Sequence, residues 1–141
     1  FAYLVEEISG SVSAYKYNHG NLKFIQRLIT HPKDYKGDIG SADIHVSPDG
    51  KFLYVSNRGD ENTLTIFSVD QATGRLALKG YQSTMGKTPR NFLIDPTGNF
   101  LLVANQNTDN VVVFKRNKQT GLLQQTDEFK VPKPVCLKMI E

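Results

Sequence analysis

The amino-acid sequence repeats itself along its length. Residues 43–57 align with residues 91–105 without a gap, and the similarity continues downstream to residues 83 and 130. A third, incomplete copy opens the chain, where Phe1 aligns with Phe52. Repeats of this length that contain short apolar runs are typical of propellers and solenoids.

Each copy contains four short apolar or alternating runs. In the middle copy these runs are residues 43–47, 52–57, 63–69 and 75–83. They are rich in β-branched and aromatic residues and too short for helices, so they are predicted to be strands. Turn residues separate them, because Pro48 fixes one φ angle and Gly50 and Gly74 can adopt positive φ. One repeat is therefore predicted to form a four-stranded antiparallel meander, and a ring of such meanders is an all-β fold, the β-propeller.

The number of repeats is smaller than a closed ring needs. Propellers typically contain four to eight blades, so residues 1–141 are expected to be a single fragment of a larger propeller. Its expected parts are a partial blade over 1–36, full blades over 37–85 and 86–132, and an inner closing strand over 133–141. Phe1 falls inside a blade's second strand, and Glu141 is expected to lie near the natural C-terminus.

Composition limits the classes of function. The chain is 39% hydrophobic and 22% charged, without an apolar run of membrane-spanning length, which indicates a globular protein that does not enter a membrane. Its net charge of +3 comes from scattered residues, so a nucleic-acid partner is not expected. The single cysteine, Cys136, excludes an internal disulfide and fits a reducing, cytoplasmic compartment. No cluster has metal-ligand spacing, so neither a metal nor another cofactor is expected.

The geometry of a meander predicts where a site would form. The inner strand starts at the rim where the second strand ends, so residues at these two positions meet at one mouth of the channel. Glu7, Arg58 and Gln106 follow the second strands, while Asp43 and the pair Arg90 and Asn91 begin the inner strands. The copies differ at these positions, which indicates an asymmetric site. Two arginines and two carboxylates there suit an anionic small molecule.

Each of these residues also has a purely structural interpretation. Arg58 and Glu7 could form an ordinary ion pair between blades, and Asp43 could cap a turn or tie adjacent inner strands together. His45 lies on the same strand as Asp43 and is expected to be a buried, hydrogen-bonded structural histidine. His19 and His31 lie in turn or loop segments, so they are expected to be solvated.

Several motifs together resemble one known family. The segments 41–59, 87–92, 95–106 and 131–138 are similar to the C-terminal portion of the seven-bladed propeller lactonases. They include Ser56-Asn-Arg-Gly59 and Pro89-Arg-Asn-Phe92. This family contains the propeller-type 6-phosphogluconolactonases and is similar to the fungal 3-carboxymuconate lactonizing enzyme. The resemblance implies that about three of seven blades are present.

The resemblance also implies a function and roles for residues. The parent protein is expected to hydrolyse a sugar-acid lactone in the pentose phosphate route without a metal, with this chain supplying part of the site. Its partners would be a small anionic lactone and the remaining blades. Glu7, Arg58 and Arg90 match the family's catalytic positions. Asp43, Asn91 and Gln106 match positions expected to bind substrate.

One family motif lies outside the sequence. The Pro-Arg-His motif, which supplies the family's catalytic histidine, would fall upstream of Phe1. Arg58 and Arg90 would bind the substrate's phosphate or carboxylate and stabilise the developing oxyanion. Glu7, together with that histidine, would activate water or shuttle a proton.

Two other classes of function stay open. A muconate-type cycloisomerase would use the same arginines for carboxylates, together with a group that transfers a proton at carbon. A non-catalytic binding propeller is the second alternative, because residues 53–57 also resemble the uniform repeats of surface propellers. The differences between copies at the rim favour an enzyme, although a fold alone does not establish function.

Overall fold

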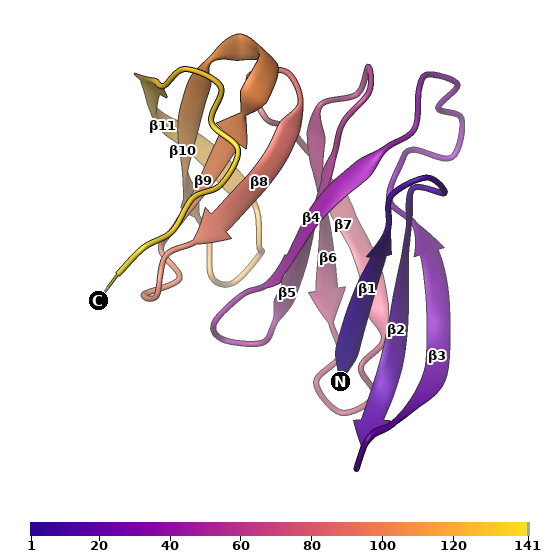
Figure 1. Cartoon of the computed structure of the whole chain (residues 1–141). Coiled ribbons are helices and arrows are strands. Elements are labelled where there is room, and N and C mark those ends of the chain that lie inside the picture. Colours follow the sequence, from indigo (N-terminus) through magenta and orange to yellow (C-terminus); the bar gives the residue numbers. More distant parts are fainter. Residues whose placement is uncertain (141) are drawn as a thin grey trace.

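The computed structural model describes residues 1–140 and consists of three separate antiparallel sheets (Figure 1). The first sheet contains β1 (Ala2–Glu6), β2 (Ser11–Asn18) and β3 (Asn21–Ile29). The second contains β4 (Ser41–Val46), β5 (Phe52–Asn57), β6 (Thr63–Val69) and β7 (Leu76–Ser83). The third contains β8 (Pro89–Ile94), β9 (Phe100–Asn105), β10 (Asn110–Arg116) and β11 (Leu123–Lys130). Each sheet is a meander in chain order, which confirms the predicted all-β, blade-like fold.

The strands lie where the repeat predicts them, with ends that differ by at most two residues in the middle copy. The inner strands β4 and β8 lie at the near side of Figure 1, while β7 and β11 lie behind them. β4 contacts both β1 and β8. The second and third sheets therefore meet along their inner strands, while the first sheet meets β4 through β1, which corresponds to a blade's second strand.

The hydrophobic core lies between the sheets. One cluster joins Tyr54, Leu64 and Ile66 of the second sheet to Phe92 and Phe114 of the third. A second cluster joins Val12 of the first sheet to residues of the second sheet that include Leu53 and Phe67. Because the second sheet is covered on both faces by its neighbours, alternate residues of its strands point into different inter-blade cores.

A repeated polar contact fixes the position of each blade relative to the next. The Tyr3 hydroxyl donates to the Gly74 carbonyl at 3.0 Å, and the Tyr54 hydroxyl donates to the Gly121 carbonyl at 2.7 Å. Both glycines also pack directly against an aromatic ring of the preceding blade, so that no Cβ could be accommodated. The Thr-Gly turns thus serve two purposes, since they close a hairpin and dock it on the neighbouring blade.

A buried arginine fastens the second and third sheets at the end where the Pro-containing turns lie. Arg116 donates from Nε to the Gly98 carbonyl at 2.7 Å and from Nη2 to Asp49 Oδ2 at 3.0 Å. Its side chain is 1% exposed. Burial raises the pKa of Asp49, but hydrogen bonds from Ser47, the Lys51 amide and Arg116 outweigh it and lower the pKa to about 2.

This pKa predicts a pH dependence of stability. In the unfolded chain Asp49 protonates near its ordinary pKa of about 3.9, so its contribution is complete above about pH 4 and is lost as pH falls through about 2. We expect Asp49→Asn to lower the free energy of unfolding at pH 7 by about 1–2 kcal/mol. Between pH 4 and pH 2, the free energy of unfolding of this variant should fall less than that of the wild type. Urea unfolding at several pH values measures both effects. A variant that keeps the wild-type acid profile would contradict the assignment.

Residues 131–140 run beside β8 but form no strand ladder with the described residues. The Leu137 amide donates to Asn91 Oδ1 at 2.7 Å, just as the Phe92 amide of β8 donates to Asp43 Oδ2 at 3.0 Å. The segment is therefore placed beside β8 in the same way as β8 is placed beside β4. The inner closing strand over 133–141 stays a prediction, and Glu141 lies outside the described residues.

Within residues 1–140, no helix is long and apolar enough to cross a membrane.

Candidate functional site

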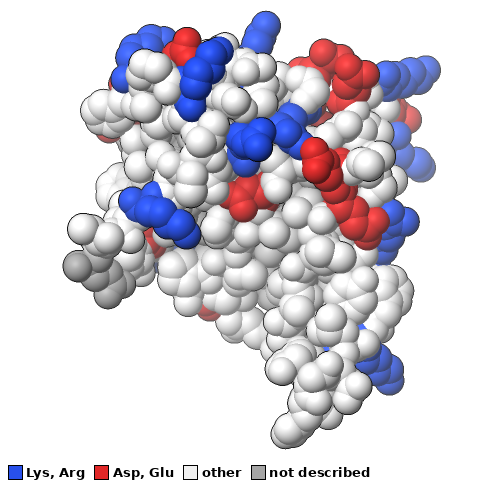
Figure 2. All heavy atoms as spheres, in the orientation of Figure 1, with Lys and Arg blue, Asp and Glu red and all other residues white. Residues whose placement is uncertain are grey.

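The predicted rim forms at one end of the sheets. Ser41 lies opposite Asn57 and Pro89 lies opposite Asn105, so inner strands begin where second strands end. This rim is at the top of Figure 1, and the Pro-containing turns lie at the other end. Acidic and basic side chains gather in the upper half of this face, while its lower half is largely uncharged (Figure 2). We call this end the charged rim.

Arg58 and Glu7 are paired across the first and second sheets. Arg58 Nη2 donates to the Glu7 carboxylate and, at 3.3 Å, to the Ser41 carbonyl. The backbone fixes both residues, because the Ser41 amide donates to the Glu7 carbonyl at 3.0 Å and the Arg58 amide to the Gly40 carbonyl at 2.6 Å. The inter-blade ion pair named as the structural alternative is thus present.

The Arg58–Glu7 pair faces a pocket. Both side chains line an open pocket of about 360 Å³, together with Gly40, Gly59 and Thr88. Arg58 is 23% exposed and Glu7 is 67% exposed, so a ligand in the pocket could reach both charges. The pair is therefore structural and accessible at once.

Arg90 is an exposed charged residue near the start of β8. It is the second residue of that strand, two residues after Thr88, and its side chain forms no hydrogen bond or ion pair with residues 1–140. Gln106 is half-buried at the start of a short 3₁₀ turn, Gln106–Thr108, where its amide donates to the Thr88 carbonyl at 3.0 Å. The backbone thus places Gln106 beside the loop that leads into β8.

Asp43 and Asn91 tie neighbouring inner strands together. Asp43 Oδ2 accepts from Asn91 Nδ2 at 2.6 Å and from the Phe92 amide at 3.0 Å, and Oδ1 accepts from the Ile44 amide at 2.9 Å. Burial raises the pKa of Asp43, but hydrogen bonds from His45 and these amides outweigh it and hold the pKa below its ordinary value. These contacts support the structural interpretation of Asp43.

His45 differs in part from its expectation. It bonds to Asp43 at 3.1 Å between Nε2 and Oδ2 and meets the Phe92 ring edge-on, with centroids 4.7 Å apart. Its side chain is nevertheless 40% exposed rather than buried. The reason is its place on the inner strand β4, which borders the channel.

His31 was expected to be solvated, and this prediction is wrong. The side chain is 1% exposed, Nδ1 bonds to the Glu61 carboxylate, and the Tyr35 ring stacks on the imidazole with centroids 5.4 Å apart. The loop that carries His31 folds down between the first and second sheets, which the neighbouring Pro32 does not reveal. His19 is exposed, as predicted.

A buried amide network underlies the rim. Asn57 Oδ1 accepts from the Ser41 hydroxyl at 3.1 Å, and Nδ2 donates to the Thr30 carbonyl at 2.9 Å and to Thr65 Oγ1 at 2.8 Å. In the third sheet Asn105 Nδ2 bonds to the Thr84 carbonyl at 2.8 Å, but its buried Oδ1 has no partner among the described residues. Pro89 stands opposite Asn105, where the second sheet has Ser41, so the hydroxyl donor is missing. The buried asparagine of the blade that carries Arg58 therefore has more of its hydrogen-bonding groups paired than the corresponding asparagine of the third sheet.

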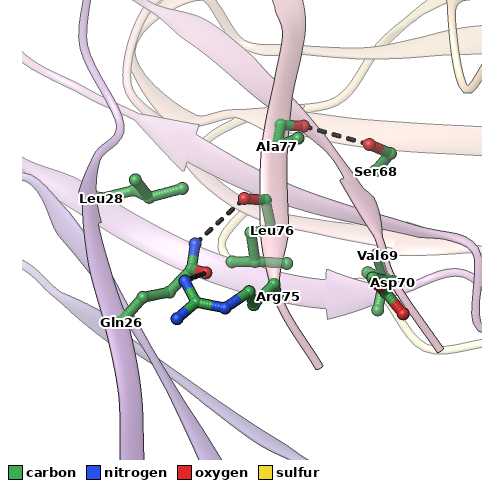
Figure 3. Close-up of a pocket in the computed structure, with 8 residues that line it drawn as sticks. All are labelled: Gln26, Leu28, Ser68, Val69, Asp70, Arg75, Leu76 and Ala77. Carbon is green, nitrogen blue, oxygen red and sulfur yellow. Dashed lines mark hydrogen bonds between the residues drawn. The ribbon is translucent and has the colours of Figure 1, made fainter. Parts of the chain in front are cut away.

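A larger pocket lies at the opposite end of the sheets. It measures about 590 Å³ and lies between β3, β6 and β7, where Gln26 Nε2 donates to the Leu76 carbonyl at 3.0 Å (Figure 3). A similar pocket of about 490 Å³ recurs in the third sheet around Arg116 and Leu123. A groove that recurs at corresponding positions belongs to the repeated scaffold, so the charged rim is the better candidate site.

Within the described residues, no group of three or more histidine, cysteine, aspartate or glutamate side chains could hold a metal ion.

Comparison with known families decides the classification. The model of the lactonase family, described as a 7-bladed β-propeller, matches residues 1–139. The chain belongs to this lactonase family. The match spans all three sheets, and the rim with Glu7, Arg58 and Arg90 is thus part of a lactonase propeller.

Curated relatives within the lactonase family share much of the sequence. A 6-phosphogluconolactonase from Formosa agariphila is 51% identical over 126 residues, which are 89% of this chain and 35% of that protein. A 6-phosphogluconolactonase from Bacillus subtilis is 41% identical over 145 residues, which are 99% of this chain and 41% of that protein. The chain spans about two fifths or less of the length of these relatives.

Two solved structures have the same fold over most of this chain. The periplasmic gluconolactonase of Pseudomonas aeruginosa superposes with a TM-score of 0.92 at 39% identity, over 96% of this chain and 38% of that one. A Lactobacillus plantarum protein superposes with a TM-score of 0.93 at 40% identity, over 99% and 41%. Because one of these neighbours is periplasmic, the cytoplasmic location stays a prediction.

Proposed function

We propose that this chain supplies three blades of a lactonase that opens a sugar-acid lactone of the 6-phosphogluconolactone type. One observation carries the proposal, namely that Arg58 and Glu7 meet across two blades and line an accessible pocket at the charged rim. Arg90, which is exposed and whose side chain lacks a partner among residues 1–140, follows two residues after Thr88, which lines that pocket. The names of the curated relatives support the same reaction class.

The arrangement supplies part of what ester hydrolysis needs. Water attacks the lactone carbonyl carbon, the ring C–O bond breaks, and a carboxylic acid and an alcohol form; the acid then releases its proton to solvent and becomes a carboxylate. Glu7 accepts the proton of the attacking water, and the proton then passes to the ring oxygen as it leaves. Arg58, held at a fixed place by Glu7 and Ser41, stabilises the negative charge that develops on the carbonyl oxygen. Arg90 binds the anionic group of the substrate.

A substrate panel with the whole protein, the polypeptide that contains this chain, tests the proposal. We expect hydrolysis of 6-phosphogluconolactone to be preferred over gluconolactone, and Arg90→Ala to raise KM for the phosphorylated lactone about tenfold with little change in kcat. The reason is that Arg90 contributes to binding in the ground state and transition state alike. Initial rates over a range of lactone concentrations measure both constants.

The panel also separates the alternatives. Preference for 3-carboxymuconate with formation of a lactone would identify a cycloisomerase and overturn the proposal. Equal KM values for Arg90→Ala and wild type on the phosphorylated lactone would remove Arg90 from the binding site. Absence of turnover with every lactone and muconate would favour a binding propeller.

A further inference from the structure

The loop that carries Arg58 is short and is fastened at both ends. It connects β5 to β6 over residues 58–62 and carries Arg58 at its beginning and Glu61 near its end. Arg58 lies at the charged rim, whereas the Glu61 side chain turns inward and is only 7% exposed. Only Gly59 and Asp60 separate Glu61 from Arg58 along the backbone, so a movement of Glu61 is transmitted to Arg58.

Glu61 is anchored by a histidine from the first blade. One carboxylate oxygen bonds to His31 Nδ1, and the other accepts from the Thr63 hydroxyl at 2.6 Å. The imidazole is itself held between the Tyr35 ring and Gly10, whose Cα approaches so closely that no Cβ could be accommodated. Buried polar groups in such a packed setting have few alternative arrangements.

The connection between β3 and β4, residues 30–40, carries His31 and also covers the other residues of the loop 58–62. Gly59 adopts a φ of 73° and passes so close to the Asp38 carbonyl that a side chain there would collide with it. The Asp38 amide also donates to Asp60 Oδ2 at 3.4 Å, and the Gly40 carbonyl accepts from the Arg58 amide at 2.6 Å. Among the contacts between residues 30–40 and the loop 58–62, the bond from His31 to Glu61 is the buried one, while the other bonds lie nearer the surface.

We propose that His31 and Glu61 are positioning residues that hold the Arg58 guanidinium at the reacting carbonyl. This inference rests on the role proposed for Arg58. Neither residue lines the pocket beside Arg58, and the pair acts only through the loop 58–62. Since a catalytic group displaced by a fraction of an ångström stabilises a developing charge much less, loosening the loop lowers the rate of the chemical step more than it weakens binding.

Glu61→Gln tests the proposal because it removes the carboxylate while preserving shape. In the whole protein we expect kcat for lactone hydrolysis to fall about tenfold and KM to change less than twofold. His31→Leu is expected to behave like Glu61→Gln, and His31→Asn, which retains a donor near Nδ1, to recover part of kcat. Unchanged kcat in Glu61→Gln and His31→Leu would overturn the proposal.

Asp49→Asn is the matched control. It also removes one carboxylate from a pair that joins two blades, but at the end opposite the charged rim. We expect its kcat to stay within twofold of wild type even where its melting temperature falls as much as that of Glu61→Gln. Equal losses of kcat in the two variants would show a general effect of stability and would overturn the positioning role.

A double-mutant cycle shows whether the effect passes through Arg58. In the Arg58→Ala background, Glu61→Gln should lower kcat no further, whereas an independent effect would multiply the two losses and overturn the proposal. If Arg58→Ala alone leaves hydrolysis unchanged, the catalytic role proposed for Arg58 fails, while the claim that His31 and Glu61 hold Arg58 in place is still tested by hydrogen exchange.

Hydrogen exchange tests the positioning claim without an activity measurement. Arg58 Nε is buried, so its N–H proton should exchange with solvent faster in Glu61→Gln than in the wild type, but not in Asp49→Asn. Equal exchange in both would overturn the positioning claim by itself.

Discussion

Arg58→Ala in the whole protein is expected to lower kcat for lactone hydrolysis by about 10²–10³-fold, the loss typical of one preorganised oxyanion donor. Arg58 is fixed by Glu7, by the Ser41 carbonyl and by its own backbone amide, so it needs no rearrangement when charge develops on the lactone. Steady-state kinetics on 6-phosphogluconolactone measure the effect. Arg58→Lys should recover little, because a lysine cannot contact Glu7 and a substrate oxygen with the same planar fork.

Arg27→Ala is the control for this experiment. Arg27 forms a similar ion pair with Glu6, the residue that precedes Glu7, but neither lines the pocket beside Arg58. We expect its kcat and KM to stay within twofold of wild type. A wild-type rate in Arg58→Ala, or an equal loss in Arg27→Ala, would remove Arg58 from the catalytic mechanism.

Arg116→Ala is expected to cost about 3 kcal/mol of stability, a large effect for a substitution outside the rim. The change leaves Asp49 without its inter-blade partner, leaves the Gly98 carbonyl without its Nε donor and removes a long, fully packed side chain. Removing one partner of a buried pair typically costs about 3–5 kcal/mol, and the partial exposure of Asp49 places this case at the lower end. Urea unfolding of the whole protein measures the change.

Arg75→Ala provides the comparison. Arg75 is exposed and donates to Gln26 Oε1 at 3.2 Å across the first and second blades, so it makes an inter-blade contact without burial. We expect it to cost less than about 1 kcal/mol. A similar cost for both arginines would show that burial of Arg116 is not what stabilises the structure.

The scaffold could be predicted from the sequence because its determinants are local and repeated. Strand alternation, Pro48 and the Thr-Gly turns recur at corresponding places, and each specifies its own segment without reference to the rest of the chain. The meeting of Glu7 and Arg58 at one end followed from the same geometry, while the convergence of Arg90 and Asp43 with them stays a prediction. The ion pair between Arg58 and Glu7 was foreseen as one of two interpretations, and the structure allows both at once.

The remaining features depend on contacts that occur only once. His31 lies in a connection, residues 30–40, that is longer than its counterpart over residues 84–88, which has no histidine, so no comparison between copies could show that His31 is buried against Glu61. Arg116 is the last residue of its strand, at a position that the pattern marks as polar, yet Gly98 and Asp49 enclose it. Both histidine and arginine are buried by partners distant in sequence, which a reading of local pattern cannot identify.

The bond from a tyrosine hydroxyl to the carbonyl of a Thr-Gly turn has a consequence for how such proteins can change. The same fastener joins the first sheet to the second and the second to the third, so any two adjacent units would fit together by the same rule. A gene can therefore lengthen by duplicating a unit without inventing a new joint. The opposite end of each unit carries none of these fasteners and is free to diversify, which separates the inheritance of architecture from the invention of chemistry.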